Sequence, residues 1–393
     1  MRKITAHKIY PIATAPLTNA VITIDNNGKI LKIDDRSNYQ DSELEIYDGA
    51  IVPGFINTHC HLELSHMKGR VHTGTGLIPF ITSVVQQREA TMELIQNAIA
   101  TAEQEMVDNG IVAVGDISNV VDTFAQKQKG NLRYYTFVEY FDFLQNENAQ
   151  TEFDKYKAVY DQLELNNGSQ KSCVPHAPYS VSPKLFNLIN AVNKGQKGTI
   201  SIHNQETPPE NQLFKDKTGG FVDFYAGFGI GLDEFEATGK PSIQYALEYM
   251  DNQHRTLFVH NTLTTKEDIE AAQQWNPNTY WATCPNANLY IENDLPNYQA
   301  FLDSNAKVTV GTDSLTSNWQ LCILDELKAI TKYQSYVPFE TLLKWATLNG
   351  AEALGFEKDL GSIEVGKTCG LNLLYNLDGK GQLQKDTQVK KII

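Results

Sequence analysis

The stretch that most constrains the fold is residues 51–66, where an apolar run ends in two histidines. The run from Ile51 to Ile56 is interrupted only by the Pro53-Gly54 turn, and His59 and His61 follow it. Residues i and i+2 of a strand point to the same side, so the two imidazoles project together from the end of a buried strand. Such a pair suits one divalent metal ion. An isolated H-x-H motif is more often a chance feature of a surface loop, so metal binding by this pair depends on further ligands elsewhere in the chain.

Length and charge limit the possible classes of protein. A chain of 393 residues is long enough for one large domain plus a small one. The formal net charge of −14 argues against nucleic acid or an anionic membrane as the main partner. No stretch reaches the roughly 18 apolar residues of a membrane span, and the N-terminus lacks a signal core. The five scattered cysteines indicate reduced thiols. We expect a cytoplasmic homo-oligomer.

From Ile51 onward the pattern alternates between apolar strands and amphipathic helices. The expected strands are 51–57, 111–117, 133–141, 172–176, 199–203, 256–260, 279–283 and 307–312. Helical patterns separate most of them, for example 86–108, 151–165, 183–193, 241–251 and 264–274. Eight such repeats favour an α/β fold of the (β/α)8 TIM-barrel type. The alternative is an open doubly wound sheet, but no G-x-G-x-x-G motif follows the first strand.

The two chain ends differ from this pattern. Residues 1–50 contain short strands and turns, including the hairpin signal Asp25-Asn26-Asn27-Gly28, which predicts a small antiparallel unit. A similar pattern returns after Gly361. We therefore expect residues 1–50 plus 360–393 to form a small β-sandwich domain, and residues 51–359 to form the barrel. The Pro- and Gly-rich segment 207–239 predicts a long loop of the kind that covers an active site.

Polar residues stand where the expected strands end. Five of the nine histidines occupy such positions, and Asp313 ends the eighth strand; the histidines are His59, His61, His176, His203 and His260. Catalytic residues of TIM barrels lie at the carboxyl ends of the strands. One buried histidine is more often part of a core, but five at one face of a barrel indicate a site.

The types of these residues point to metal chemistry. A plausible nitrogen and oxygen shell for Zn²⁺, with room for water, consists of His59, His61, His203 and Asp313. The metal would lower the pKa of that water toward neutrality, and Asp313 could take its proton. Glu206, three residues after His203, could act as general acid and base, or could cap a backbone amide. His260 could hydrogen-bond the water or the substrate, or be a further ligand or a core residue.

These motifs resemble the amidohydrolase superfamily. The resemblance rests on P-G-F-I-N-T-H-C-H at 53–61, the histidines on later strands and G-T-D at 311–313, and it covers nearly the whole chain. It implies metal binding by the four ligands above, with His260 near the metal-bound water. Members with two metals usually carry a carboxylated lysine at the end of the fourth strand. Here His176 stands there and Lys171 precedes the strand, so we expect one divalent ion, Zn²⁺ or Fe²⁺.

Further motifs resemble the deaminase branch, which acts on aminated heterocycles. They are H-x-x-E at 203–206, H-A-P-Y-S at 176–180 and G-D-I-S at 115–118. H-L-E-L-S at 61–65 resembles aminodeoxyfutalosine deaminases, enzymes of a menaquinone pathway. Glu63 is then a candidate partner for ribose hydroxyls or a ring nitrogen, or it orients a ligand histidine, and His176 is a candidate substrate contact. Many of these relatives have an arginine and a serine after Cys-Pro, where this chain has Asn286 and Ala287.

The sequence therefore predicts a metal-dependent hydrolytic deaminase of an adenine-type nucleoside, most directly aminodeoxyfutalosine. In this hypothesis Glu206 protonates the ring nitrogen, and Asp313 and His260 assist at the water. Aromatic residues that could stack on the purine are Phe80, Tyr179, Phe221, Phe224, Tyr225 and Phe228. The alternatives are deamination of guanine, methylthioadenosine or adenosylhomocysteine, chlorohydrolase or cyclic amidase activity, and a non-catalytic binding protein. The intact ligand set disfavours the last.

Overall fold

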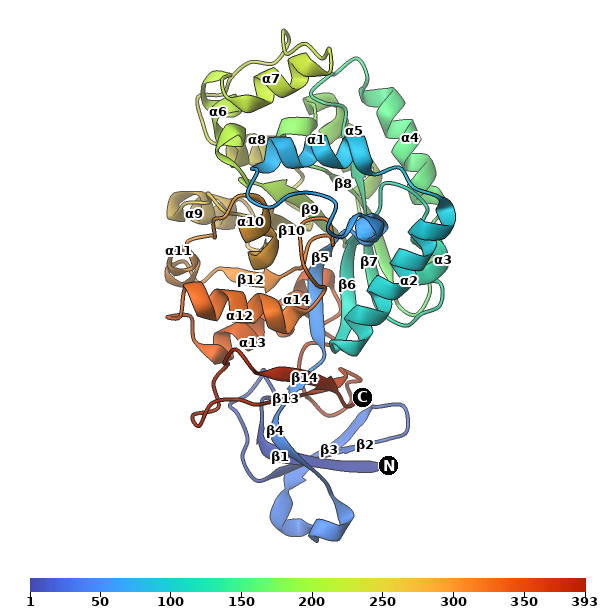
Figure 1. The fold of residues 1–393 in the computed structure, drawn as a ribbon, viewed down its shortest axis with the longest axis vertical. Helices are drawn as coiled ribbons and strands as arrows, with labels where there is room; N and C mark the ends of the chain where they lie inside the picture. The colour runs from blue at the N-terminus through green and yellow to red at the C-terminus, as the bar shows by residue number, and fades with distance from the viewer.

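The computed structural model describes all residues from 1 to 393, and eight parallel strands form its larger part (Figure 1). They are β5 (Phe55–Cys60), β6 (Ile111–Ile117), β7 (Arg133–Tyr140), β8 (Gln170–Pro175), β9 (Thr199–Asn204), β10 (Arg255–His260), β11 (Thr279–Thr283) and β12 (Lys307–Val310). Two sheets result, ordered β5-β6-β7-β8 and β9-β10-β11-β12. Their strands are buried along nearly their whole length, which explains the apolar runs in the sequence.

Hydrogen bonds between the ends of the two sheets close the barrel. On one side the backbone amide of His203 donates to the carbonyl of His176 at 2.9 Å. On the other side the amides of Thr312 and Asp313 donate to the carbonyl of His59 at 3.0 Å. The predicted TIM barrel is confirmed, and both of its seams pass through predicted site residues.

Helices surround the strands and pack their apolar faces on the barrel. They are α1 (Leu77–Gln87), α2 (Met92–Asp108), α3 (Phe124–Lys127), α4 (Ala149–Gln162), α5 (Pro183–Asn193), α8 (Ser242–Tyr249), α9 (Lys266–Trp275), α10 (Pro285–Ile291), α11 (Tyr298–Asp303), α12 (Ile323–Tyr333), α13 (Phe339–Ala346) and α14 (Leu348–Leu354). The helix predicted at 86–108 is in fact the end of α1 and all of α2. The break occurs because the Thr91 hydroxyl accepts from the Leu94 amide and caps a new helix.

The prediction of a long loop at 207–239 was wrong. This segment contains α6 (Pro208–Asp216) and α7 (Gly220–Gly227), which lie at the end of the barrel opposite the chain termini (Figure 1). Pro208 stands in the first turn of α6, where the missing amide proton of proline costs nothing. Gly219 precedes α7 with a φ of 87°. Both residues mark helix starts here, although they suggested a loop.

Strands from both chain ends form one six-stranded sheet beside the barrel. They are β1 (Arg2–Ile9), β2 (Ala20–Ile24), β3 (Ile30–Asp35), β4 (Glu45–Pro53), β13 (Leu371–Tyr375) and β14 (Gln388–Lys391), in the order β14-β13-β4-β1-β2-β3. The predicted hairpin connects β2 and β3. The N-terminal unit is not wholly antiparallel, because β1 pairs with β4 in parallel after the intervening hairpin. An isoleucine-rich core of its own supports this sheet.

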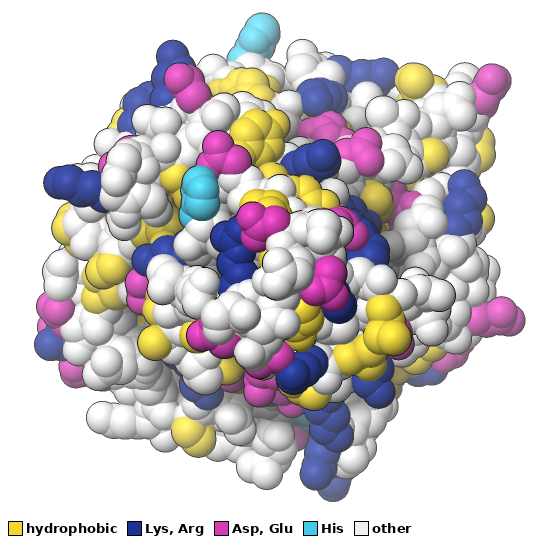
Figure 2. Space-filling model, turned by 90° about the horizontal axis from the view of Figure 1, so that it is seen from below, with side chains coloured by type: hydrophobic (Ala, Val, Ile, Leu, Met, Phe, Trp, Pro, Cys, Tyr) yellow, Lys and Arg dark blue, Asp and Glu magenta, His cyan; other side chains and the backbone are white.

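Figure 2 shows the end of the molecule that carries the small domain. Acidic and basic side chains are interspersed over this face, and hydrophobic side chains are scattered among them. None of the helices combines the length and the apolar character that crossing a membrane would require.

Candidate active site

The predicted metal ligands meet at the carboxyl ends of their strands. The Nε2 atoms of His59 and His61 are 3.1 Å apart, and they lie 3.6 and 3.4 Å from Oδ1 of Asp313. His203 belongs to the same cluster, since one ring nitrogen from each of the three histidines lies within 4.8 Å of the others. His59, His260 and Asp313 satisfy the same criterion. The side chains that the sequence places at the ends of the strands therefore lie close together in the structure.

The hydrogen bonds of the outer ring nitrogens fit metal binding. Nδ1 of His203 lies 2.8 Å from the carbonyl oxygen of His176 and 3.2 Å from Oε1 of Glu139. Nδ1 of His260 lies 2.9 Å from Oδ1 of Asn288. Each Nδ1–H can thus donate outward and leave the Nε2 lone pair facing the cluster, as metal-binding histidines commonly do. The set of imidazole and carboxylate donors fits a divalent ion such as Zn²⁺.

The charge states of the buried groups also suit such an ion. Burial lowers the pKa to about 4 for each of three histidines, His59, His61 and His260. These imidazoles are neutral at pH 7, which is the form that binds metals. Burial alone would raise the pKa of Asp313, but the surrounding histidines hold it well below its usual range. Asp313 is therefore an ionised carboxylate.

Glu139 is a site residue that the sequence interpretation missed. It is buried at the end of β7, and its carboxylate faces the His203 ring. Burial opposes protonation of His203, but the charge and hydrogen bond of Glu139, together with smaller contributions from its other neighbours, raise the pKa of His203 to about 9. Metal binding at Nε2 would displace that proton. The signal in the sequence was a carboxylate within the apolar strand pattern 133–141.

Glu206 lies beside the cluster with a buried carboxyl. Its Oε1 is 3.7 Å from Nε2 of His260, and its side chain is buried. Burial raises the pKa of Glu206 well above its ordinary value, which favours the protonated carboxyl. The structure does not support amide capping by Glu206. Glu210 has that role, since it accepts from the backbone amides of Gln205 and Glu206 at 2.9 and 3.1 Å.

The backbone is strained at three positions around this cluster. Gln205, His260 and Asp313 have φ angles of 46°, 71° and 56°, in the left-handed region that non-glycine residues rarely adopt. Such conformations cost about 1–3 kcal/mol each and concentrate at functional sites. The backbone is therefore strained at or directly before Glu206, His260 and Asp313, whose side chains point into the cluster.

A pocket of about 210 Å³ opens onto the cluster. Its polar lining includes Glu63, His176 and Glu206, and its apolar walls include Leu77, Phe80, Ile81, Val84, Phe141 and Phe224. Among the predicted aromatic contacts, those that line the pocket are Phe80, Tyr179, Phe224 and Tyr225. Phe221 is buried and stacks on Tyr179 with ring centroids 4.3 Å apart, and Phe228 packs on Phe224. Of the two helices in segment 207–239, α7 therefore contributes to the pocket wall.

The two predicted substrate contacts both face this pocket. Oε2 of Glu63 accepts from the backbone amides of Asn119 and Val120 at 2.9 and 3.2 Å, and burial raises the pKa of Glu63 to about 7. The Glu63 carboxyl does not hydrogen-bond a histidine, so the structure favours a substrate contact over orientation of a ligand. Nδ1 of His176 is 2.7 Å from the Ser180 hydroxyl.

Lys171, by contrast, lies away from the cluster. Its Nζ donates to the carbonyls of Tyr160 and Leu163 at 2.7 and 2.8 Å, beside α4. It cannot reach the histidines from there.

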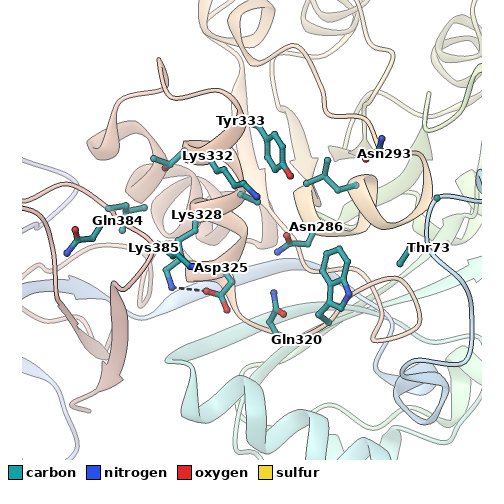
Figure 3. A pocket seen from close by; sticks show the side chains of 16 residues that line it. Thr73, Asn286, Asn293, Gln320, Asp325, Lys328, Lys332, Tyr333, Gln384 and Lys385 are labelled. Carbon is teal, nitrogen blue, oxygen red and sulfur yellow. Dashed lines mark hydrogen bonds and ion pairs between the residues drawn. The ribbon is translucent and has the colours of Figure 1, made fainter.

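A larger groove of about 950 Å³ lies elsewhere, along α10, α12 and residues 383–385 (Figure 3). Lysine and amide side chains line it, including Lys328, Lys332 and Asn286, and Lys328 pairs with Asp325 at 3.0 Å. No histidine lines this groove. The smaller pocket is therefore the candidate active site, because it alone of the two contains the converging imidazoles and carboxylates.

Comparisons with known proteins agree with this site. Residues 50–391 match the model of the amidohydrolase family. The chain is 28% identical to an adenosine deaminase of Helicobacter pylori, over 83% of this chain and 79% of that protein. It is also 28% identical to an aminodeoxyfutalosine deaminase of Nitratiruptor, over 82% and 78% of the two chains.

Solved structures give the same picture. The aminofutalosine deaminase of H. pylori, in complex with methylthio-coformycin, superposes with a TM-score of 0.81 at 25% identity, covering 95% of this chain and 92% of that one. A zinc complex of atrazine chlorohydrolase from Arthrobacter aurescens shares the fold, with a TM-score of 0.73 at 17% identity over 96% and 88%. The chain thus belongs to the amidohydrolase family and is a hydrolase that acts on carbon–nitrogen bonds.

Proposed function

We propose that the protein is a metal-dependent hydrolytic deaminase of an adenine-type nucleoside. The observation that carries this proposal is the buried carboxyl of Glu206, whose Oε1 lies 3.7 Å from Nε2 of His260 at the edge of the histidine cluster. Hydrolytic deamination requires a proton for the ring nitrogen while water adds to the adjacent carbon. A buried acid next to a metal-binding cluster can provide that proton.

Each residue of the cluster then has a distinct role. A single divalent ion, Zn²⁺ by our expectation, would be held by His59, His61, His203 and Asp313, and when bound it would activate water as a Lewis acid. Asp313 accepts the proton of the attacking water. His260 orients that water through Nε2, since its Nδ1 is occupied by Asn288. Glu206 protonates the ring nitrogen, and Asp313 passes the proton taken from the water to the amino group. Ammonia then leaves as the carbonyl forms, and the remaining proton of the added water returns to Glu206.

The pocket and the relatives support a nucleoside as substrate. Glu63 would bind the ribose hydroxyls and His176 would contact the purine, while Phe80, Tyr179 and Phe224 would cover its faces. Two of the similar proteins carry aminodeoxyfutalosine or aminofutalosine in their names. Aminodeoxyfutalosine is therefore the first substrate to test, and activity on it would assign the protein to menaquinone biosynthesis.

The test is ammonia release measured as kcat/KM for aminodeoxyfutalosine, methylthioadenosine, 5′-deoxyadenosine, adenosine, adenine and guanine. Nucleosides should be preferred, because a free base would leave Oε1 of the buried Glu63 carboxyl without a hydrogen-bond donor. A preference for adenine or guanine would contradict the nucleoside assignment. Hydrolysis of a chlorinated triazine or a cyclic amide, with no ammonia from any purine, would contradict deamination itself.

A further inference from the structure

We infer that Arg88 is a specificity-determining residue that binds a carboxylate on the 5′ substituent of the substrate. This inference rests on the proposed function and names a property of its substrate. Arg88 is the one lysine or arginine among the side chains that line the active-site pocket. All the other ionisable groups of the lining are histidines, carboxyls and two tyrosines, so the pocket offers an anionic group of a substrate a single permanent cation.

The exposed fractions of two pocket-lining side chains place Arg88 at the pocket mouth. Glu63 is 3% exposed, whereas Arg88 is 42% exposed. Arg88 therefore lies on the solvent side of Glu63. In an adenine nucleoside the 6-amino group and the ribose lie at opposite ends of the purine. With the amino group at the histidines, the ribose reaches Glu63 and the 5′ substituent reaches the mouth.

The Arg88 guanidinium is available to a ligand. It forms no hydrogen bond with the protein, and its nearest carboxylate oxygen is Oε1 of Glu63, 4.0 Å away. Glu63 in turn already accepts from the amides of Asn119 and Val120 through Oε2. A guanidinium offers five donors in a planar fork that matches a carboxylate bidentately. A carboxylate on the substrate would therefore complete the coordination of Arg88 without displacing a protein partner.

The position of Arg88 is set by the segment that carries Glu63. Arg88 ends α1, and its backbone carbonyl lies 2.8 Å from Nε2 of His66 in the short 3-10 helix η3 (Leu62–Met67). Arg70 donates to the neighbouring carbonyl of Gln87 at 3.4 Å. These contacts join the end of α1 to η3. Glu63 and Arg88 are therefore presented together, one to the ribose and the other to the group beyond it.

The surroundings of Arg88 favour a 5′ substituent that has an apolar stem and ends in an anionic group. Val84 and Val85 of α1 and Phe143 line the mouth on the approach to Arg88. One arginine balances one negative charge, and Glu63 stands close enough to disfavour a second. A monocarboxylate on an apolar 5′ substituent therefore fits better than a phosphate dianion.

The experiment compares two 5′-thioadenosines that differ only at the end of the 5′ chain, one a carboxylate and the other the corresponding primary amide. Wild-type enzyme should deaminate the carboxylate with a kcat/KM at least about tenfold higher, since hydrogen bonds to charged groups are the stronger ones. Arg88→Met should lower kcat/KM for the carboxylate about 10- to 100-fold. The Arg88→Met substitution should change kcat/KM for the amide and for methylthioadenosine by less than about threefold. Arg88→Lys should retain part of the preference for the carboxylate over the amide.

Arg70→Met is the matched control, because Arg70 contacts the same helix end but does not line the pocket. It should leave the preference for the carboxylate unchanged. An equal loss on all three substrates in Arg88→Met would overturn the inference, since Arg88 would then only support Glu63. So would a wild-type preference for adenosine 5′-monophosphate over the carboxylate, or wild-type indifference between carboxylate and amide, although the deaminase proposal would survive both. Absence of ammonia from every nucleoside would instead reject the proposed function and the inference together.

Discussion

At the residue scale, the chemistry depends on which side chains hold protons and which hold lone pairs. Neutral His59, His61 and His260 face an ionised Asp313, and next to them stands Glu206, whose pKa is raised by burial well above its ordinary value. Burial alone would leave every one of these groups neutral. Asp313 is the exception because histidines surround it, whereas Glu206 has only a 3.7 Å contact with one. The two carboxyls are therefore suited to opposite roles, base and acid.

Glu206→Gln should leave the metal bound and reduce kcat by about 10²- to 10⁴-fold, because the amide keeps the shape but cannot transfer the proton. The measurements are ammonia release and elemental analysis of the same preparation. Glu236→Gln, an exposed carboxylate of the same segment, is the control and should behave as wild type. A Glu206→Gln variant with near wild-type turnover would show that another group is the acid.

Glu139→Gln should weaken zinc affinity about 10- to 100-fold, because the amide no longer holds the Nδ1–H of His203 with a full charge. A competition titration with a zinc chelator measures this directly, and Glu164→Gln on the surface is the control. His203→Ala, which removes the ligand itself, should lose metal and activity together. Unchanged zinc affinity in Glu139→Gln would mean that the His176 carbonyl alone orients the ring.

At the scale of elements, a buried ion pair connects β6 and α3 to the segment with the two histidines. Nζ of Lys127 is 2.6 Å from Oδ2 of Asp116, and both side chains are almost fully buried. Oδ1 of Asp116 accepts from the backbone amide of Leu62 at 2.8 Å, directly after His61. The ion pair therefore supports the point where β5 ends and η3 begins, and with it the direction of His61.

Lys127→Met and Asp116→Asn should each destabilise the protein by about 3–5 kcal/mol, because each leaves a buried partner unpaired. The double variant should be destabilised by less than the sum of the two, since it leaves no unpaired charge. Urea unfolding monitored by circular dichroism measures all three. The control is Lys129→Met at an exposed position nearby. Additive effects would show that the two side chains do not act as a pair.

At the scale of the whole molecule, the candidate metal site joins the two halves of the barrel. In one sheet, His59 lies in β5 and His61 comes directly after it. In the other sheet, His203 lies in β9 and Asp313 comes shortly after β12. A metal bound to all four would connect the halves at the seams where only a few backbone hydrogen bonds join them. Metal binding and the stability of the barrel should therefore be coupled.

Removal of the metal with a chelator should lower the melting temperature, and zinc should restore it. A ligand at 100 times its dissociation constant stabilises a protein by about 2.7 kcal/mol. Differential scanning calorimetry measures the shift, and His203→Ala should show none. Elemental analysis should give one metal per chain, because Lys171 is held beside α4. A reproducible ratio of two, with a bridged pair in a crystal structure, would contradict this.

The sequence by itself determined the barrel and most residues of the candidate metal site. The strand period and the position of a residue at a strand end are local properties of the sequence. Residues adjacent in the sequence were therefore enough to identify His59, His61, His203, His260 and Asp313. Local signals failed where they were ambiguous. Pro208 and Gly219 in segment 207–239 are compatible with a loop and with the start of a helix, and only packing on the barrel selects the helix.

Only the tertiary structure decided the partners of these residues. Closure of the barrel brings Glu139 to His203, the turn of α10 brings Asn288 to His260, and the end of α1 brings Arg88 to Glu63. Each pair joins elements that are distant in the chain, and no periodicity relates them. Protonation states depend on the same assembly, because burial and neighbouring charges shift a pKa only once the fold has formed.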